Sequence, residues 1–84
     1  MSRKEEKSTV TIAESNAPVA ENIAKAIRHK GLKQMYIAEK AGYKQQEFND
    51  MLNGRKLIRV SDVLRISSAL SVDANYLYGI EKGA

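Results

Sequence analysis

The sequence has no cysteine, and its 84 residues include a single histidine and a single proline. Without cysteine the chain has no disulfide bonds, cysteine-ligated metal sites or thiol chemistry, which is compatible with a reducing compartment. His29 has no second histidine or cysteine with which to share a metal ion, so we interpret it as a solvated residue at a helix end. The sequence also lacks paired carboxylates in a convincing site, a phosphate-cradling glycine loop and a nucleophile accompanied by a base. We therefore expect a protein that is not an enzyme and has no cofactor or metal site.

Long hydrophobic runs are also missing. The longest are far shorter than the roughly 20 residues that a membrane-spanning helix needs, and the charged N-terminus is not followed by the apolar segment of a signal peptide. We expect a soluble, cytoplasmic protein with one small domain and a modest core, and no membrane partner. Because the sequence ends shortly after Gly79, we expect neither a separate sensor domain nor a small-molecule ligand.

Positive charge is concentrated in the middle of the sequence. The formal net charge is +4, yet residues 25–59 alone contain nine basic residues against three acidic ones, a local charge of +6. Basic and acidic residues cancel in residues 1–17. A basic surface of this kind suits a polyanion such as nucleic acid.

Residues 1–17 are polar and of mixed charge, with one short alternating piece at residues 9–12. They are interpreted as a flexible tail, as an arm that reaches DNA, or as a strand that pairs with its copy across a dimer axis. Pro18 is tolerated in a first helical turn, with Asn16 or Ala17 at the cap, so the first helix is expected to begin there. The domain is then predicted to occupy residues 18–80, with residues 81–84 as a C-terminal tail.

Helical periodicity predicts five helices and no sheet. The expected helices cover residues 19–30, 33–41, 45–53, 61–70 and 73–78. Gly31 and Gly79 end the first and the last of them, and Asp73 caps the last. The apolar stripe of the fourth helix is expected to contain Val63, Leu64, Ile66 and Leu70.

Gly42 separates the second and third helices and supplies the positive φ that a sharp reversal requires. The apolar faces of the two helices are Ile37, Ala38 and Ala41 on the second, and Phe48, Met51 and Leu52 on the third. Gln46, Asn49, Asp50 and Asn53 fall on the outer face of the third helix. Two short helices with facing apolar residues and a glycine turn indicate a helix-turn-helix.

The C-terminal segment is rich in large apolar groups. Tyr76, Leu77, Tyr78 and Ile80 are too many for so short a segment to leave in solvent. They complete the core, form a dimer contact, or divide between the two. The residues considered for the dimer contact are Tyr76, Tyr78 and Ile80.

The run from Leu32 to Gly79 resembles the DNA-binding domain of the phage repressor and Cro family, the xenobiotic-response-element type of helix-turn-helix. The residues that carry the resemblance are Gln34, Ile37-Ala38, Gly42, Gln45-Gln46, Phe48, Asn53-Gly54 with the basic loop of residues 55–59, Ala69-Leu70, Val72 and Tyr76-Leu77. The resemblance covers residues 19–79. It implies an all-α, five-helix lambda-repressor-like domain whose second and third helices form the helix-turn-helix.

The same resemblance implies a function. We expect a sequence-specific regulator of transcription, of the repressor type, that binds double-stranded DNA as a homodimer on an inverted repeat. Half-sites about 10 base pairs apart follow from placing two recognition helices in successive major grooves. The alternative is a protein-interaction module of the same fold, such as an antitoxin or an antirepressor, because a fold does not settle a function.

The resemblance also implies roles for individual residues. Gln34 matches the position where the start of the second helix binds a DNA phosphate. Glutamine pairs in two places with adenine N6 and N7, so adenine is expected opposite Gln45 or Gln46, whereas Asp50 or Glu47 accepts from cytosine N4. The predicted base-reading residues are Gln45, Gln46, Asp50, Lys44, Glu47 and Asn49. The predicted phosphate-binding residues are Gln34, Asn53, Arg55, Lys56, Arg59 and Lys33, with solvated side chains as the alternative for Lys33 and Lys44.

The sequence departs from the family pattern in three places. Lys33 stands where relatives often have a Thr or Ser helix cap. Ile27 and Leu52 stand where many relatives pair an arginine with a glutamate, and we predict that these two side chains touch in the core, with neither fully exposed. Asp50 places an acid on a surface that is expected to face phosphates.

Overall fold

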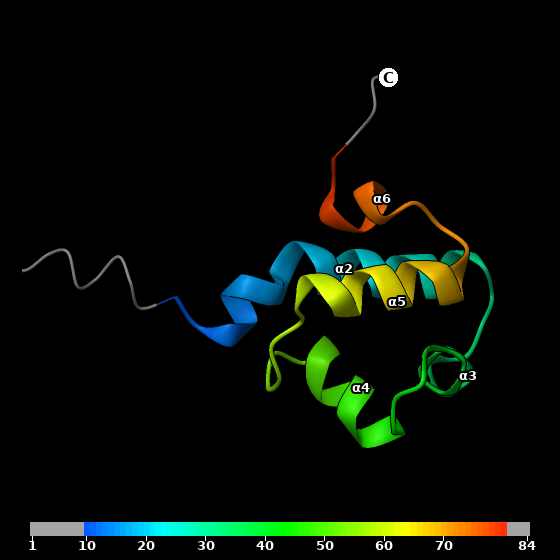
Figure 1. Cartoon of the computed structure of the whole chain (residues 1–84), viewed down its shortest axis with the longest axis horizontal. Coiled ribbons are helices and arrows are strands. Elements are labelled where there is room, and N and C mark those ends of the chain that lie inside the picture. Colours follow the sequence, from blue (N-terminus) through cyan, green and yellow to red (C-terminus); the bar gives the residue numbers. More distant parts are fainter. Residues whose placement is uncertain (1–9, 81–84) are drawn as a thin grey trace, which may run out of the picture.

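Five helices and no strand make up residues 10–80, the part of the chain that the computed structural model describes (Figure 1). The helices are α2 (Ile12–His29), α3 (Gln34–Ala41), α4 (Gln45–Leu52), α5 (Val60–Leu70) and α6 (Ala74–Tyr78). They form a compact all-α globule, as the periodicity predicts. The expected tail at residues 81–84 and the first nine residues of the expected N-terminal tail lie outside the described part.

The long helix α2 organises the fold because it contacts each of the other four helices. Helices α2 and α5 run side by side, with α6 above them and α3 and α4 below in Figure 1. Helix α3 packs against both α4 and α5. Within residues 10–80 no helix is both long and apolar enough to cross a membrane.

The expected start of the first helix near Pro18 is wrong, because α2 begins at Ile12. Thr11 caps it: its Oγ1 accepts from the backbone N–H of Glu14 at 3.0 Å, and the Glu14 carboxylate accepts from the backbone N–H of Thr11 at 3.1 Å. This reciprocal capping box satisfies two backbone donors at the helix start. Pro18 is therefore an interior residue of α2, and neither a free tail nor a strand describes residues 11–17.

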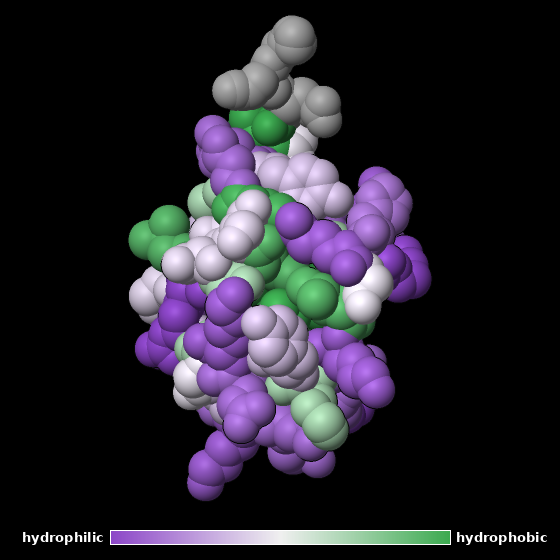
Figure 2. Space-filling view, turned by 90° about the vertical axis from the view of Figure 1, so that its right-hand side faces the viewer, coloured by the Kyte–Doolittle hydropathy of each residue, from purple (hydrophilic) through white to green (hydrophobic). Residues whose placement is uncertain are grey.

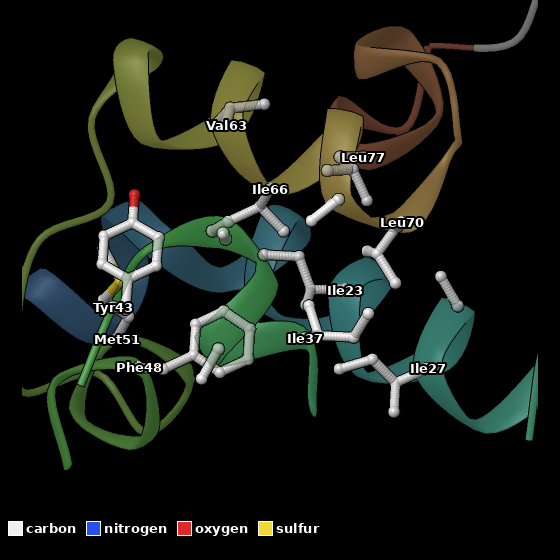
Figure 3. Close-up of a cluster of buried hydrophobic side chains, with 14 of the residues drawn as sticks. Ile23, Ile27, Ile37, Tyr43, Phe48, Met51, Val63, Ile66, Leu70 and Leu77 are labelled. Atoms are coloured by element: carbon white, nitrogen blue, oxygen red, sulfur yellow. The ribbon is translucent and has the colours of Figure 1, made fainter. Parts of the chain in front are cut away.

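The core is assembled from one face of each helix. Figure 3 shows Ile23 of α2, Ile37 of α3, Ile66 of α5 and Leu77 of α6 gathered at its centre, and all four are fully buried. The predicted apolar faces of α3 and α4 are confirmed, since Ile37, Ala38, Ala41, Phe48 and Met51 are buried while Leu52 is half-buried against the same cluster.

One residue of the predicted α5 stripe is misplaced. Val63, Ile66 and Leu70 are buried, but Leu64 is 56% exposed. At about 100° per residue, Leu64 is turned away from the side that the other three share. The outer side of α5 therefore carries an apolar residue that the core does not use.

Neither Ile27 nor Leu52 is fully exposed. Ile27 is buried, and Leu52 lies at the edge of the core cluster. Leu52 lines a surface hollow together with Ala20 and Ala24, which lie about two turns and one turn before Ile27 on α2. Burial of the pair is as expected, and their direct contact stays a prediction.

Two left-handed residues set the directions of α4 and α6. Gly42 has φ 87°, as predicted for the sharp turn between α3 and α4, and it is followed by a bond from the Tyr43 N–H to the Ala38 carbonyl at 2.8 Å. Ser71 ends α5 with φ 58°, the one non-glycine residue with positive φ among residues 10–80. A serine in this region is uncommon, so the sequence did not indicate it.

Candidate nucleic-acid interface

The outer face of α4 presents a group of amide side chains. The apolar side of α4 is fixed in the core by Phe48 and Met51, which turns the remaining positions toward solvent. A hollow of about 330 Å³ is lined by Gln34, Gln45, Gln46 and Asn49. The structure thus brings three predicted base-reading residues together with the predicted phosphate ligand at the start of α3.

Two of these side chains are linked across the two helices. The Gln34 side-chain N–H donates to Oδ1 of Asn49 at 3.4 Å, a long hydrogen bond between the first residue of α3 and the middle of α4. Oδ1 of Asn49 also accepts from the Asn53 side-chain N–H at 3.1 Å. The two N–H groups of Asn49, and one N–H and the oxygen of Gln34, remain to face a base edge. The contact links the start of α3 to the exposed side of α4.

The Asp50 side chain has two hydrogen-bond partners. Its Oδ1 accepts from the Gln46 side-chain N–H at 2.9 Å and from the Arg55 Nε–H at 3.1 Å. Its backbone carbonyl accepts from the N–H groups of Arg55 and Lys56 at 2.8 and 3.2 Å. One residue therefore holds both a predicted base-reading glutamine and the beginning of the basic loop.

The second acid of α4 is also close to a cation of that loop. Glu47 Oε2 lies 3.8 Å from Nζ of Lys56. Both ion pairs of α4 are partly exposed, so each is worth only about 1 kcal/mol or less. They are weak enough to yield to a competing phosphate.

Three further cations that are predicted to contact DNA stand at helix starts. Lys33, Lys44 and Arg59 occupy the N-cap positions of α3, α4 and α5, and none of the three side chains caps its helix. The absence of a cap at Lys33 follows the departure noted in the sequence. Backbone N–H groups in the first turn of a helix lack an intrahelical partner and favour anions. The starts of α3 and α4 thus combine a cation with free donors, whereas at the start of α5 the Asp62 carboxylate accepts from the Arg59 N–H at 2.9 Å.

Asn53 occupies the C-terminal end of α4. Its side-chain N–H donates back to the Asn49 carbonyl at 2.9 Å, and the side chain itself is exposed. The loop that follows, residues 53–59, contains Arg55, Lys56 and Arg59, which are exposed as well. All the predicted phosphate-binding side chains except the half-buried Gln34 are accessible.

Asn16 is a residue whose role the sequence analysis missed. It is 2% exposed, and its side-chain N–H groups donate to the carbonyls of Met51 at 3.0 Å and Lys56 at 2.8 Å. Its Oδ1 accepts from the Ile58 N–H at 2.9 Å. The expected role of Asn16 as a helix cap is wrong, since it lies inside α2 on the buried side shared with Val19 and Ile23.

Tyr43 ties the turn between α3 and α4 to α5. Its ring stacks on Phe48 with a centroid distance of 6.0 Å, and the Arg65 guanidinium carbon lies 4.8 Å from the ring centroid. Figure 3 shows its hydroxyl directed toward α5, where it donates to the Asp62 carboxylate. Burial, together with this hydrogen bond and the nearby negative charge of Asp62, raises the pKa of Tyr43 above its ordinary value of 10.0. The bond fixes the entry to α4.

The apolar residues of the C-terminal segment differ in burial, and the predicted dimer contact stays a prediction. Leu77 is fully buried and completes the core, whereas Tyr76, Tyr78 and Ile80 are exposed, Ile80 to 57%. Figure 2 shows separate patches of apolar surface, in green, between polar side chains on one face of the molecule. An accessible apolar surface is therefore present where the dimer contact is predicted.

No metal site is apparent in residues 10–80, where no group of three or more histidine, cysteine, aspartate or glutamate side chains is suitably clustered.

No protein-family model matches the chain, and comparisons with curated proteins and with solved structures find no match either. The function must therefore be argued from the site itself.

Proposed function

We propose that the chain is a sequence-specific double-stranded DNA-binding regulator, of the repressor type, in which α3 and α4 act as a lambda-repressor-like helix-turn-helix. The observation that carries the proposal is the amide-lined hollow of Gln34, Gln45, Gln46 and Asn49 on the open face of α4, bordered by accessible cations. A short helix with polar, short side chains outside and a fixed apolar face inside suits insertion into a major groove.

The hydrogen bonds of Gln46 support its proposed role in reading a base. One side-chain N–H is held by Asp50 at 2.9 Å. The second N–H and the oxygen are left to pair with N7 and N6 of adenine. Asp50 thereby orients the glutamine, and the acid that departs from the family pattern acquires a function.

The positions of the cations support binding to the DNA backbone. Lys33 and Lys44 stand beside the uncapped starts of α3 and α4, and Arg59 stands at the start of α5. The side chains of Arg55 and Lys56 are held only by partly exposed ion pairs. Phosphate contacts of this kind fix the register of a protein on DNA but carry no sequence information. They would supply most of the affinity and its salt dependence.

The same proposal includes a homodimer on an inverted repeat. The exposed Tyr76, Tyr78 and Ile80 provide the apolar contact, with half-sites about 10 base pairs apart. The second candidate, a protein-interaction module of the same fold, is favoured by the additional exposed apolar residues Val60 and Leu64 on α5. Such a module would need no sequence-specific DNA binding.

The test is selection of bound duplexes from a random pool, followed by titration of the recovered duplex at several salt concentrations. The regulator predicts a defined sequence, and weak, sequence-blind binding throughout would favour the interaction module. Gln46→Ala should lower discrimination at one base position by about 1–3 kcal/mol, whereas Arg55→Ala should weaken all sequences alike and reduce the salt slope by about 1. Equal losses on selected and random DNA for Gln46→Ala would contradict its base-reading role.

A further inference from the structure

We propose that Asn16 is a positioning residue for the basic loop between α4 and α5, so that the N-terminal turns of α2 belong to the DNA-binding machinery. The inference rests on the proposed function for its consequence, but its structural part stands without it. Asn16 is too deeply buried to contact DNA itself, and it acts through the loop to which it is bonded.

Both N–H groups and the oxygen of the Asn16 side chain are hydrogen-bonded. It donates to the carbonyls of Met51, in the last turn of α4, and Lys56, in the loop, and it accepts from the N–H of Ile58. A buried polar group that loses its partners carries a large desolvation cost, so these bonds form together or leave unpaired groups behind. Asn16 thereby connects the end of α4 to two positions of the loop that follows.

A second contact between the same two segments lies one turn earlier on α2. A Cβ placed on Gly54 would lie 2.7 Å from Cβ and 2.9 Å from Cα of Ala13, so the loop backbone presses directly on the first turn of the helix. Ala13 and Asn16 are three residues apart and share one side of α2. The loop therefore packs against the turns of α2 that precede Pro18.

The loop is held from the opposite side by α4. The peptide N–H groups of Arg55 and Lys56 donate to the Asp50 carbonyl, and the carbonyl of Lys56 accepts from Asn16. The peptide groups on both sides of Lys56 are thus fixed. A cation held in its binding geometry loses less conformational freedom when it meets a phosphate, which increases affinity without any added contact.

Another asparagine on α2 provides a matched control. Asn22 also uses its side-chain N–H to hold a distant carbonyl, that of Leu77 at 3.0 Å, and so anchors α6 rather than the loop. Helix α6 carries none of the predicted DNA contacts, although Tyr76 and Tyr78 of the predicted dimer contact lie on it. Asn22→Ala removes one side-chain bond to a distant carbonyl where Asn16→Ala removes three bonds. The place where hydrogen exchange accelerates, the loop or α6, therefore separates a specific effect on the loop from general loosening.

The experiment compares Asn16→Ala with Asn22→Ala in the full chain, at a temperature at which both are folded. Amide hydrogen exchange without DNA should accelerate at Lys56 and Ile58 by about tenfold or more in Asn16→Ala and not in Asn22→Ala. Affinity for a random-sequence 20-base-pair duplex should fall about three- to tenfold in Asn16→Ala only, with a salt slope shallower by about 0.9 for each DNA phosphate that the loop no longer binds. Unchanged exchange at Ile58, or equal losses of affinity in the two variants, would overturn the proposal.

The test also covers a variant that does not fold and a wild type that binds no DNA. If Asn16→Ala does not fold, Thr11→Ala removes the exposed cap of the same helix extension, and exchange at Ile58 should still rise by about threefold; no rise would overturn the proposal. If the wild type binds no DNA at all, the proposed function fails while the exchange comparison still decides whether Asn16 holds the loop.

Discussion

Asp50→Asn tests the arrangement of charges on α4 most directly. Asparagine keeps the shape of the side chain and an oxygen that accepts from Gln46, but it removes the negative charge that holds Arg55 at 3.1 Å. The net charge rises from +4 to +5 because one of the ten acidic residues is replaced. If Arg55 must leave Asp50 to bind a phosphate, the variant should bind DNA more tightly and less selectively.

The size of the effect follows from the exposure of the pair. The side chains of Arg55 and Asp50 are 60% and 29% exposed, so the ion pair contributes about 0.2–1 kcal/mol. Its removal should raise the affinity for random-sequence DNA about 1.4- to 5-fold, while the salt slope changes little, because Arg55 contacts the same phosphate in both proteins. Selected DNA should gain less, because the orientation of Gln46 is less firmly fixed.

Fluorescence anisotropy with a labelled 20-base-pair duplex, between about 50 and 200 mM salt, measures the affinity for DNA and its salt slope. Asp73→Asn is the matched control: it makes the same change of charge at the N-cap of α6, on the other side of α2 and α5, and asparagine caps a helix as well as aspartate does. If Asp73→Asn raises affinity as much as Asp50→Asn does, the effect is one of net charge alone. An unchanged affinity for Asp50→Asn would refute the competition between Asp50 and phosphate.

Three further predictions concern stability, measured by urea unfolding. Gly54→Ala should destabilise the chain by about 1–3 kcal/mol more than Gly31→Ala, because both residues have positive φ but only Gly54 would press a Cβ on Ala13; equal losses would contradict this. Lys33→Thr should stabilise the chain by about 1 kcal/mol by supplying the missing cap of α3, and should flatten the DNA salt slope by about 0.9 if Lys33 binds a phosphate. Tyr43→Phe should lower the free energy of unfolding by about 0.5–1.5 kcal/mol. Because the pKa of Tyr43 is raised above 10.0, the extra stability of the wild type is complete below pH 10 and declines as the pH rises further. A difference between the two proteins that stays constant above pH 10 would contradict this.

The parts of the fold that the sequence predicted are those set by local signals. The α3–α4 pair follows from helical periodicity and from Gly42, whose left-handed conformation few other residues adopt without strain. Phe48 and Met51 then identify the buried side of α4 by angle alone. The residues on the opposite side, including Gln46, were predicted correctly as outward for the same reason.

The start of α2 was misjudged because two local signals compete there. Pro18 favours a first helical turn, but the Thr11 to Glu14 spacing is a capping box that begins a helix seven residues earlier. Extending the helix to Ile12 would have placed Asn16 on the buried side with Val19. The capping box was therefore the signal that could have found Asn16 as a core residue.

Partners distant in the sequence could not be predicted. Asn16 bonds to groups 35 to 42 residues away, and Tyr43 bonds to a carboxylate 19 residues away. No periodicity relates such positions, since each depends on how whole helices pack. Asp50 belongs to the same class in part: its pairing with Arg55 depends on the course of the chain after Gly54.

These non-local contacts meet at one place, and this decides what a mutation there would reveal. Asp50 holds the basic loop from α4 through its carbonyl and carboxylate, and Asn16 holds it from α2 through its amide. Loss of the Asp50 charge frees Arg55 but leaves the backbone bonds in place, whereas loss of the Asn16 amide loosens the backbone but leaves every charge in place. If the loop binds phosphate as a preorganised element, the first change strengthens binding to random DNA and the second weakens it. If the loop acts only as a diffuse positive charge, Asn16→Ala has no effect on binding.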